Sequence, residues 1–166
     1  ATPPDTPPTP APEVNPYVVP DTAPEPFSVE LTRTTASKGW GWAIDEMDGP
    51  TFFVDGVSSV AGSPVDKYNL TAPSGRRIQQ GDYIVGISDS ADGSAKPHDV
   101  LDKSLRMTVT VQRPITFTAN VEMKQSAQLG LKVKYSQKGA CLWIEEVEDG
   151  GAAQAQAPML RPGDRI

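Results

Sequence analysis

Two short stretches, Gly39-Trp40-Gly41-Trp42 and Gly81-Asp82-Tyr83-Ile84, decide how the chain is organised. Each is echoed further along, by Gln128-Leu129-Gly130-Leu131 and by Gly163-Asp164-Arg165-Ile166. The two motifs are 40 residues apart in the first copy and 33 in the second, counted between the glycines at 41 and 81 and at 130 and 163. A fixed order of motifs at similar spacing indicates two tandem copies of one unit.

The residues around these motifs alternate between apolar and polar side chains, a pattern typical of half-buried strands. Helical patterns are few and short, so the sequence predicts a mainly β chain. The expected strands are 27–32, 42–45, 52–57, 83–88, 107–112, 115–123, 131–135 and 140–147. The expected helices are 98–103 and 151–157, and the polar stretch 64–77 is expected to be a loop that lengthens the first copy.

Residues 1–26 differ sharply in composition, because they hold ten of the seventeen prolines, four acidic residues and no basic one. Proline fixes φ and lacks a backbone donor, so this arm is expected to run as an extended polyproline II chain. The predicted organisation is a Pro-rich acidic arm at 1–26, a first unit at 27–113 and a second unit at 114–166. The second unit stops where a strand begins, so we expect it to be incomplete or completed by a partner strand.

Composition excludes several classes of function. The formal net charge of −6 argues against nucleic acid or an anionic membrane surface as partner. No apolar stretch approaches the roughly 20 residues that span a bilayer, so no transmembrane segment is expected. One Cys and one His exclude a disulfide framework and the usual zinc ligand sets. We expect no catalytic residues, no metal site and no cofactor.

The ordered combination of motifs resembles the PDZ domain family, most closely over residues 115–166 and more distantly over 27–113. The resemblance implies two tandem small, partly open β-barrels with short helices. Such domains bind an extended peptide as an added strand beside their second strand. A glycine turn presents backbone N–H groups to the terminal carboxylate of that peptide. The residues that match this turn are Trp40, Gly41 and Trp42 in the first unit and Leu129, Gly130 and Leu131 in the second.

The same resemblance implies roles for two side chains near the turn. Trp42 would fill most of the pocket for the last peptide residue, so the first unit is expected to accept only a small terminal side chain. His98, at the start of the helix that forms the other wall of the groove, would select a Ser or Thr in the ligand. The alternative is that His98 is a surface histidine in a turn after Pro97.

Two functions remain open from the sequence. The first is a non-enzymatic scaffold that binds partner proteins or their C-terminal peptides by strand addition. The alternative is a structural accessory subunit, packed permanently on a large organellar membrane complex such as a photosystem with its antenna proteins. Divergent, Trp-rich PDZ-like repeats of this kind are similar to ones found in single-celled algae. The chain is expected to be soluble, and in the second case to lie in an organelle, on the plastid or thylakoid side, after processing.

Overall fold

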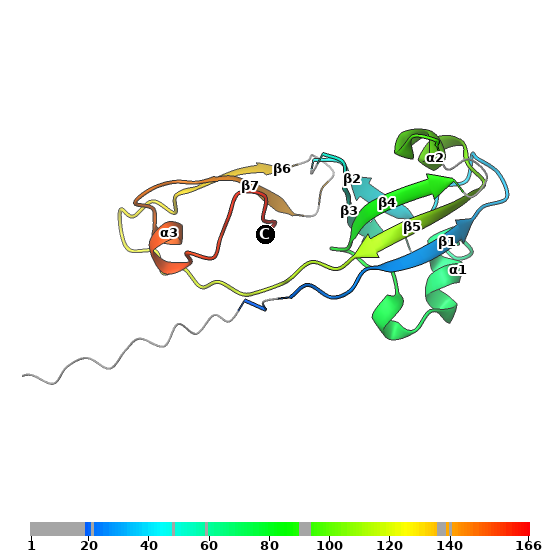
Figure 1. Cartoon of the computed structure of the whole chain (residues 1–166). Coiled ribbons are helices and arrows are strands. Elements are labelled where there is room, and N and C mark those ends of the chain that lie inside the picture. Colours follow the sequence, from blue (N-terminus) through cyan, green and yellow to red (C-terminus); the bar gives the residue numbers. More distant parts are fainter. Residues whose placement is uncertain are drawn as a thin grey trace, which may run out of the picture.

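The computed structural model describes residues 19–20, 22–47, 49–58, 60–89, 94–135, 139 and 141–166 (Figure 1). Most of the predicted Pro-rich arm, residues 1–18 and 21, lies outside the described residues. Residues 22–26 form neither helix nor strand. They run beside the first sheet, where the side chain of Gln112 donates a hydrogen bond of 2.6 Å to the carbonyl oxygen of Pro24.

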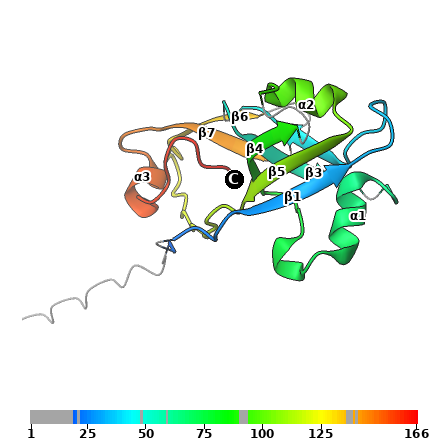
Figure 2. The same cartoon turned by 45° about the vertical axis from the view of Figure 1, so that its right-hand side comes forward.

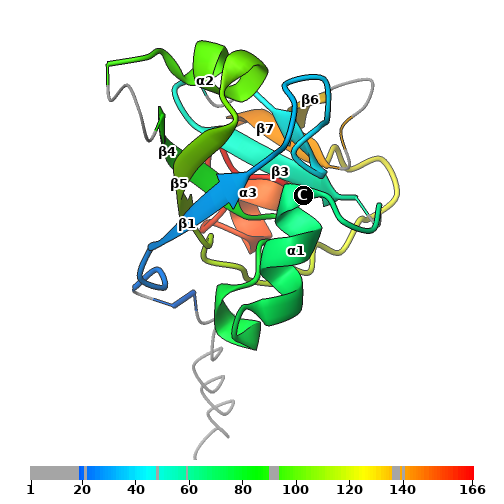
Figure 3. The ribbon, with the colours of Figure 1, turned by 90° about the vertical axis from the view of Figure 1, so that its right-hand side faces the viewer.

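The first unit is built on one antiparallel sheet in the order β1-β5-β4-β3-β2. β2 and β1 are therefore its two edge strands. In Figure 3, α2 lies near the top and α1 near the bottom of this unit, and both contribute to one core. The strands are β1 (Phe27–Thr32), β2 (Trp42–Asp45), β3 (Phe52–Val57), β4 (Tyr83–Asp89) and β5 (Arg106–Gln112), and the helices are α1 (Pro64–Thr71), a short 3-10 turn (Ser74–Arg76) and α2 (Pro97–Lys103).

The core of this unit lies between the sheet and its two helices. Alternation along β1 buries Phe27, Val29 and Leu31, which face the equally alternating residues of β5. Val65 at the start of α1 and Val100 of α2 are fully buried against this sheet. A period of two along both strands therefore places one apolar face against the helices, as the sequence predicts.

The second unit is smaller and comprises β6 (Leu131–Tyr135), β7 (Leu142–Val147) and α3 (Ala152–Gln156). β6 and β7 form an antiparallel pair. The C-terminal residues run along the other side of β7, where Leu142 and Ile166 exchange two backbone hydrogen bonds of 2.8 Å. Figures 1 and 2 show these C-terminal residues (red) between β7 and the extended segment that follows β5.

The two units repeat the same local backbone contacts at the matching motifs. Both hairpins also shift register after their second residue pair, between Ala43 and Ile44 and between Lys132 and Val133. Three backbone hydrogen bonds of the first unit have a counterpart in the second. The bond from Ser58 N–H to Gly41 O matches the bond from Glu148 N–H to Gly130 O, and the bond from Val65 N–H to Trp40 O matches the bond from Ala153 N–H to Leu129 O. The bond from Val54 N–H to Asp82 O matches the bond from Ile144 N–H to Asp164 O.

The structure corrects three expectations. Neither sheet closes into a barrel, so the described strands form open sheets. The strand expected at 115–123 does not form, because no strand of the described residues pairs with it. The loop expected at 64–77 is instead α1 followed by the 3-10 turn. Ser63 caps α1 by accepting a hydrogen bond from Asp66 N–H, and Pro64 occupies the first turn.

Candidate functional site

A groove of about 400 Å³ lies between the edge strand β2 and the helix α2. Its lining combines apolar side chains with charged ones, Arg33, Glu46 and Asp102. Because β2 pairs on one side only, with β3, its other side faces this groove. The lining residues are Arg33, Ala36, Gly39, Trp40, Trp42, Ile44, Glu46, His98, Leu101 and Asp102.

The glycine turn at Trp40 and Gly41 lies beside the groove, and Gly39 and Trp40 belong to the groove lining. Both carbonyl oxygens of the turn are occupied, that of Trp40 by Val65 N–H at 3.0 Å and that of Gly41 by Ser58 N–H at 2.8 Å. Within the described part of the chain, the N–H groups of Trp40 and Gly41 have no hydrogen-bond acceptor. A turn with occupied carbonyls and available N–H groups is suited to an anion.

Gly41 has a second, structural reason to be glycine. Its φ of +98° is a conformation that residues with a Cβ rarely adopt. A Cβ at this position would also lie only 2.7 Å from Cβ of Ser63, the N-cap of α1. The turn therefore packs directly on the start of the following helix.

Trp42 and Ile44 are the two residues of β2 that line the groove. The carbonyl of Gly41 accepts a hydrogen bond from Ser58 N–H, just after β3. The N–H of Trp42 belongs to the same trans peptide unit and points opposite to that carbonyl, so it faces away from β3. The side chains of Trp42 and Ile44 are half-buried, and they line the groove beside Leu101 of α2.

Arg33 holds the turn and α2 together. Its guanidinium donates to the carbonyl oxygens of Lys38, in the loop before the turn, and of Leu101 and Asp102, at the end of α2, over 2.8–3.0 Å. It also stacks over the Trp40 ring at 4.2 Å, and Trp40 Nε1 donates to the Leu101 carbonyl at 2.8 Å. Burial lowers the pKa of this guanidinium from its ordinary value, and Asp102 opposes that shift.

Sequence reasoning missed Arg33, although one signal was present. Arg33 continues the buried alternation of Phe27, Val29 and Leu31 on the same face of the chain. A charged residue at a core position is expected only where it is fully hydrogen-bonded. The interruption of the apolar pattern by arginine therefore marked a buried polar network.

His98 lies at the rim of the groove, in the first turn of α2. Its side chain is 65% exposed, with Nδ1 3.7 Å from a carboxylate oxygen of Glu46. Its ring meets the Phe52 ring edge-on, with centroids 5.6 Å apart. The structure thus brings His98 to the same groove as Trp40 and Trp42, while Gly41 is not among the residues that line it.

The turn of the second unit has the same backbone contacts as the turn of the first. Leu129 is 42% exposed, and Gly130, at φ +73°, packs on Gly151, the N-cap of α3. The one helix described in the second unit is α3, which begins at the turn itself, whereas α2 and β2 of the first unit line a common groove. Leu129, Gly130 and Leu131 are therefore brought together as a turn, without the second wall that the resemblance implies.

The described residues contain no group of three or more His, Cys, Asp or Glu side chains placed to hold a metal ion. None of the described helices is long and apolar enough to cross a membrane. No family model and no curated protein matches the chain.

Proposed function

We propose that the chain is a non-enzymatic protein–protein interaction scaffold whose first unit binds an extended peptide as an added strand along β2. The observation that carries this proposal is the open groove of about 400 Å³ between the edge of β2 and α2. An exposed sheet edge offers main-chain hydrogen bonds, and a side-chain groove beside it gives specificity. Both units are proposed to be PDZ-like, which the matching turn contacts support.

The proposed ligand ends in a free carboxylate that binds the N–H groups of Trp40, Gly41 and Trp42. The first two have no acceptor among the described residues, and that of Trp42 points to the groove. Because the Trp42 side chain already lies in the groove, the terminal side chain of the ligand is proposed to be small. His98, exposed at the rim, is proposed to contact a Ser or Thr nearer the middle of the peptide.

Binding of short peptides tests this function directly. The probes are fluorescein-labelled heptapeptides with free C-terminal carboxylates, ending in Gly, Ala, Ser, Val, Leu or Phe. We expect saturable polarisation changes for the small terminal residues and loss of binding when the same peptides are amidated. Binding that is equal for acid and amide, or absent throughout, would overturn the proposal.

Two variants sharpen the test. Trp42→Ala enlarges the groove, so peptides ending in Leu or Phe are expected to gain affinity relative to those ending in Ala. Val85→Ala is the matched control, because Val85 is an exposed apolar residue of β4 that does not line the groove. An equal effect of both variants on peptide preference would exclude Trp42 from the binding site.

One observation favours the second function, an accessory subunit packed permanently on a large organellar membrane complex such as a photosystem with its antenna. The second unit exposes apolar side chains along its hairpin and turn, among them Tyr135 at 70% and Leu142 at 40%. A permanent interface commonly buries more than about 2,000 Å² and is rich in such residues. Native purification at low and high salt tests it, because a permanent subunit co-purifies with its complex in both.

A further inference from the structure

A pocket of about 310 Å³ lies in the first unit, between the loop that follows β1 and the loop that leads into α1. It shares Arg33 and Gly39 with the groove beside β2, and its other lining residues are different. Its volume is at the lower end of the range of small-molecule sites. We name it the lysine pocket, and it is lined by Thr32, Arg33, Thr34, Lys38, Gly39, Val60, Ala61, Gly62, Ser63, Pro64 and Lys67.

The lysine pocket concentrates positive charge in a chain whose formal net charge is −6. Arg33, Lys38 and Lys67 line it, and no acidic side chain does. Within the part of the chain that the structure describes, Lys38 and Lys67 form no ion pair. Positive groups gathered in a pocket attract a ligand of opposite charge.

Arg33 adds a buried charge that has no paired carboxylate among the described residues. It is only 6% exposed, and its guanidinium donates to the carbonyl oxygens of Lys38, Leu101, Asp102 and Ser104. Buried charges are normally balanced by an opposite charge. An anion in the lysine pocket would provide that balance beside the guanidinium.

Neutral hydrogen-bond donors accompany the cations. The N–H groups of Gly39 and Ala61 have no acceptor among the described residues. The hydroxyl-bearing residues Thr32 and Thr34 line the same pocket. Several donors around one pocket suit a ligand with several acceptor oxygens.

The start of α1 contributes the Lys67 side chain rather than free backbone amides. The N–H of Asp66 donates to Oγ of Ser63 at 3.3 Å, and the N–H of Lys67 donates to the Ser63 carbonyl at 2.9 Å. The N–H of Gly62 is taken by the Asp66 carboxylate at 2.7 Å, and Asp66 does not line the pocket. Cε of Lys67 lies 4.0 Å from the position a Cβ would occupy on Gly62, so this side chain runs along the pocket wall.

We propose that the lysine pocket binds the phosphate group of a small, water-soluble phosphate monoester. Such a group carries a charge of about −1.5 to −2 near neutral pH and three strong acceptor oxygens. It therefore matches the two unpaired ammonium groups and the neutral donors beside them. Val60, Ala61 and Pro64 line the rest of the pocket and provide apolar contact for the organic part of the ligand.

Phenyl phosphate is the probe, added to the full chain at an ionic strength held constant with sodium chloride. We expect saturable shifts of the Thr34, Gly39 and Ala61 amides in ¹H–¹⁵N spectra. Inorganic phosphate should bind more weakly, because it makes no apolar contact. Benzoate, which has the same ring and a single negative charge, should bind at least about tenfold more weakly than phenyl phosphate.

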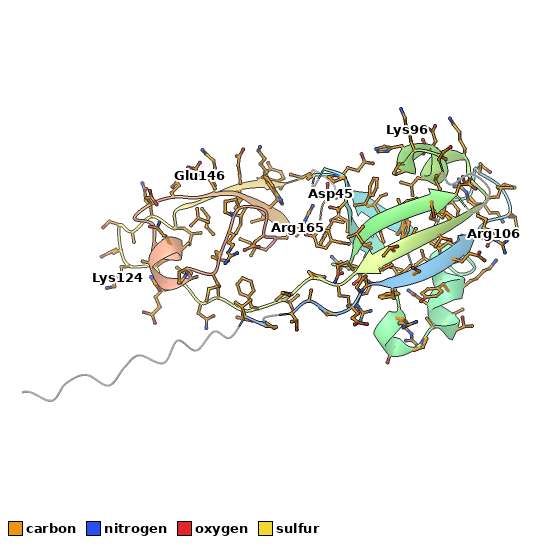
Figure 4. The ribbon with its side chains drawn as sticks, viewed as in Figure 1. Asp45, Lys96, Arg106, Lys124, Glu146 and Arg165 are labelled. Carbon is orange, nitrogen blue, oxygen red and sulfur yellow. The ribbon has the colours of Figure 1, made fainter. Side chains whose placement is uncertain are left out.

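Lys38→Gln combined with Lys67→Gln removes both ammonium groups, and Lys96→Gln combined with Lys124→Gln is the matched control. Lys96 and Lys124 are exposed, do not line the pocket and are labelled in Figure 4. Both double variants change the net charge equally. We expect phenyl phosphate to bind the first at least about tenfold more weakly, because two charged contacts are lost, and to bind the second as it binds the wild type.

Val60→Ser tests the apolar part of the pocket separately. Val60 is 65% exposed, so the exchange leaves the core of the first unit unchanged. We expect phenyl phosphate to bind this variant about two- to fivefold more weakly, since apolar contact is lost. The affinity for inorganic phosphate should stay the same.

Four results would overturn the proposal. The first is the absence of saturable shifts with phenyl phosphate, and the second is an equal loss of affinity in the two double variants. The third is equal affinity for benzoate and phenyl phosphate, which would make the pocket a general anion site. The fourth is a phosphoserine peptide that binds at least tenfold more tightly than phenyl phosphate, which would assign the pocket to a phosphorylated protein. Trp42→Ala should leave phenyl phosphate binding unchanged, so failure of this proposal and failure of the carboxylate-binding groove are separate results.

Discussion

Gly41 joins the candidate binding turn to the helix behind it. Its φ of +98° and the nearness of Ser63 both oppose a side chain. Gly41→Ala is expected to lower the free energy of unfolding by about 1–3 kcal/mol, measured by chemical denaturation. The double variant with Ser63→Gly should recover part of that loss, because it removes the atoms the new Cβ would meet.

Gly130 provides the contrast within the same chain. A Cβ there would lie 2.6 Å from Cα of Gly151, a backbone atom that no substitution removes. Gly130→Ala is therefore expected to be destabilising without such a rescue. A fully tolerated alanine at 41 would contradict the packing of the turn on α1.

Asp82 makes the stability of the first unit depend on pH. Burial raises the pKa of its carboxyl above the ordinary value, although Gln79 N–H and Arg113 favour the ionised form. A raised pKa in the folded state means that the protonated carboxyl stabilises the fold below the unfolded pKa, and that this stabilisation is lost as pH rises through the folded pKa. The free energy of unfolding of the wild type, relative to Asp82→Asn, should therefore fall as pH rises above about 4.

Asp99 is the matched control for this titration. Its pKa is lowered by the hydrogen bond from Lys103, so its folded carboxylate is favoured. The free energy of unfolding of the wild type, relative to that of Asp99→Asn, should therefore increase as pH rises through the same range. Denaturation curves from pH 3 to 8 measure the two differences in free energy of unfolding. A difference between the wild type and Asp82→Asn that is constant or rises with pH would contradict a raised pKa of Asp82.

At the scale of elements, Arg33 sets the distance between the glycine turn and α2. Its bonds to carbonyls at the end of the helix also place a cation where the helix dipole favours one. Arg33→Met is expected to cost about 2–3 kcal/mol of unfolding free energy, since buried carbonyls lose a charged donor. Arg106→Met, which removes only an exposed pair with Glu30, should cost less than about 1 kcal/mol. Equal costs would show that the Arg33 network does not organise the groove.

The sequence predicts those strands that a local alternation of apolar and polar residues is enough to identify. The strands predicted from this alternation at 27–32, 42–45, 52–57 and 131–135 begin and end at the same residues as β1, β2, β3 and β6. The same reasoning failed at 115–123, where the alternation is present but a strand also needs a partner. It also missed α1, because only Pro64 and Val65 of that helix are buried and no apolar stripe forms. The start signals Ser63 and Pro64 were the available clue.

Only those parts of the candidate site that are marked by a local sequence motif could be predicted; contacts between distant segments could not. The glycine turns could be found from their motifs, and His98 from its place in the expected helix. The network of Arg33, and the absence of a second wall beside Gly130, depend on contacts between segments distant in sequence. Such contacts follow from the sheet order, which local patterns do not determine.

At the scale of the whole molecule, a buried ion pair links the two units. Arg165 donates to an Asp45 carboxylate oxygen at 3.0 Å, with both side chains only 7% exposed, and its guanidinium lies 4.0 Å above the Phe53 ring. Figure 4 shows the two charged side chains facing each other across the junction. The same guanidinium contacts the sulfur of Cys141 at 3.2 Å.

Asp45→Ala should weaken this junction by roughly 3–5 kcal/mol, because it leaves a buried guanidinium without its carboxylate. The expected result is independent tumbling of the units, seen as shorter and unequal rotational correlation times in ¹⁵N relaxation. Glu146→Ala, which removes an exposed pair with Lys132, should leave a single correlation time. One correlation time in both variants would show that other contacts hold the units together.

The central claim is that β2 and its glycine turn receive a peptide that ends in a carboxylate. The most direct measurement is a titration, followed by ¹H–¹⁵N spectra, with two peptides identical in sequence that end in Ala as the free acid or as the amide. Saturable shifts of the Gly41 and Trp42 amides with the acid alone are the expected result, together with smaller shifts along β2 and at His98. Identical shifts with both peptides, or none at residues 40–44, would contradict the claim.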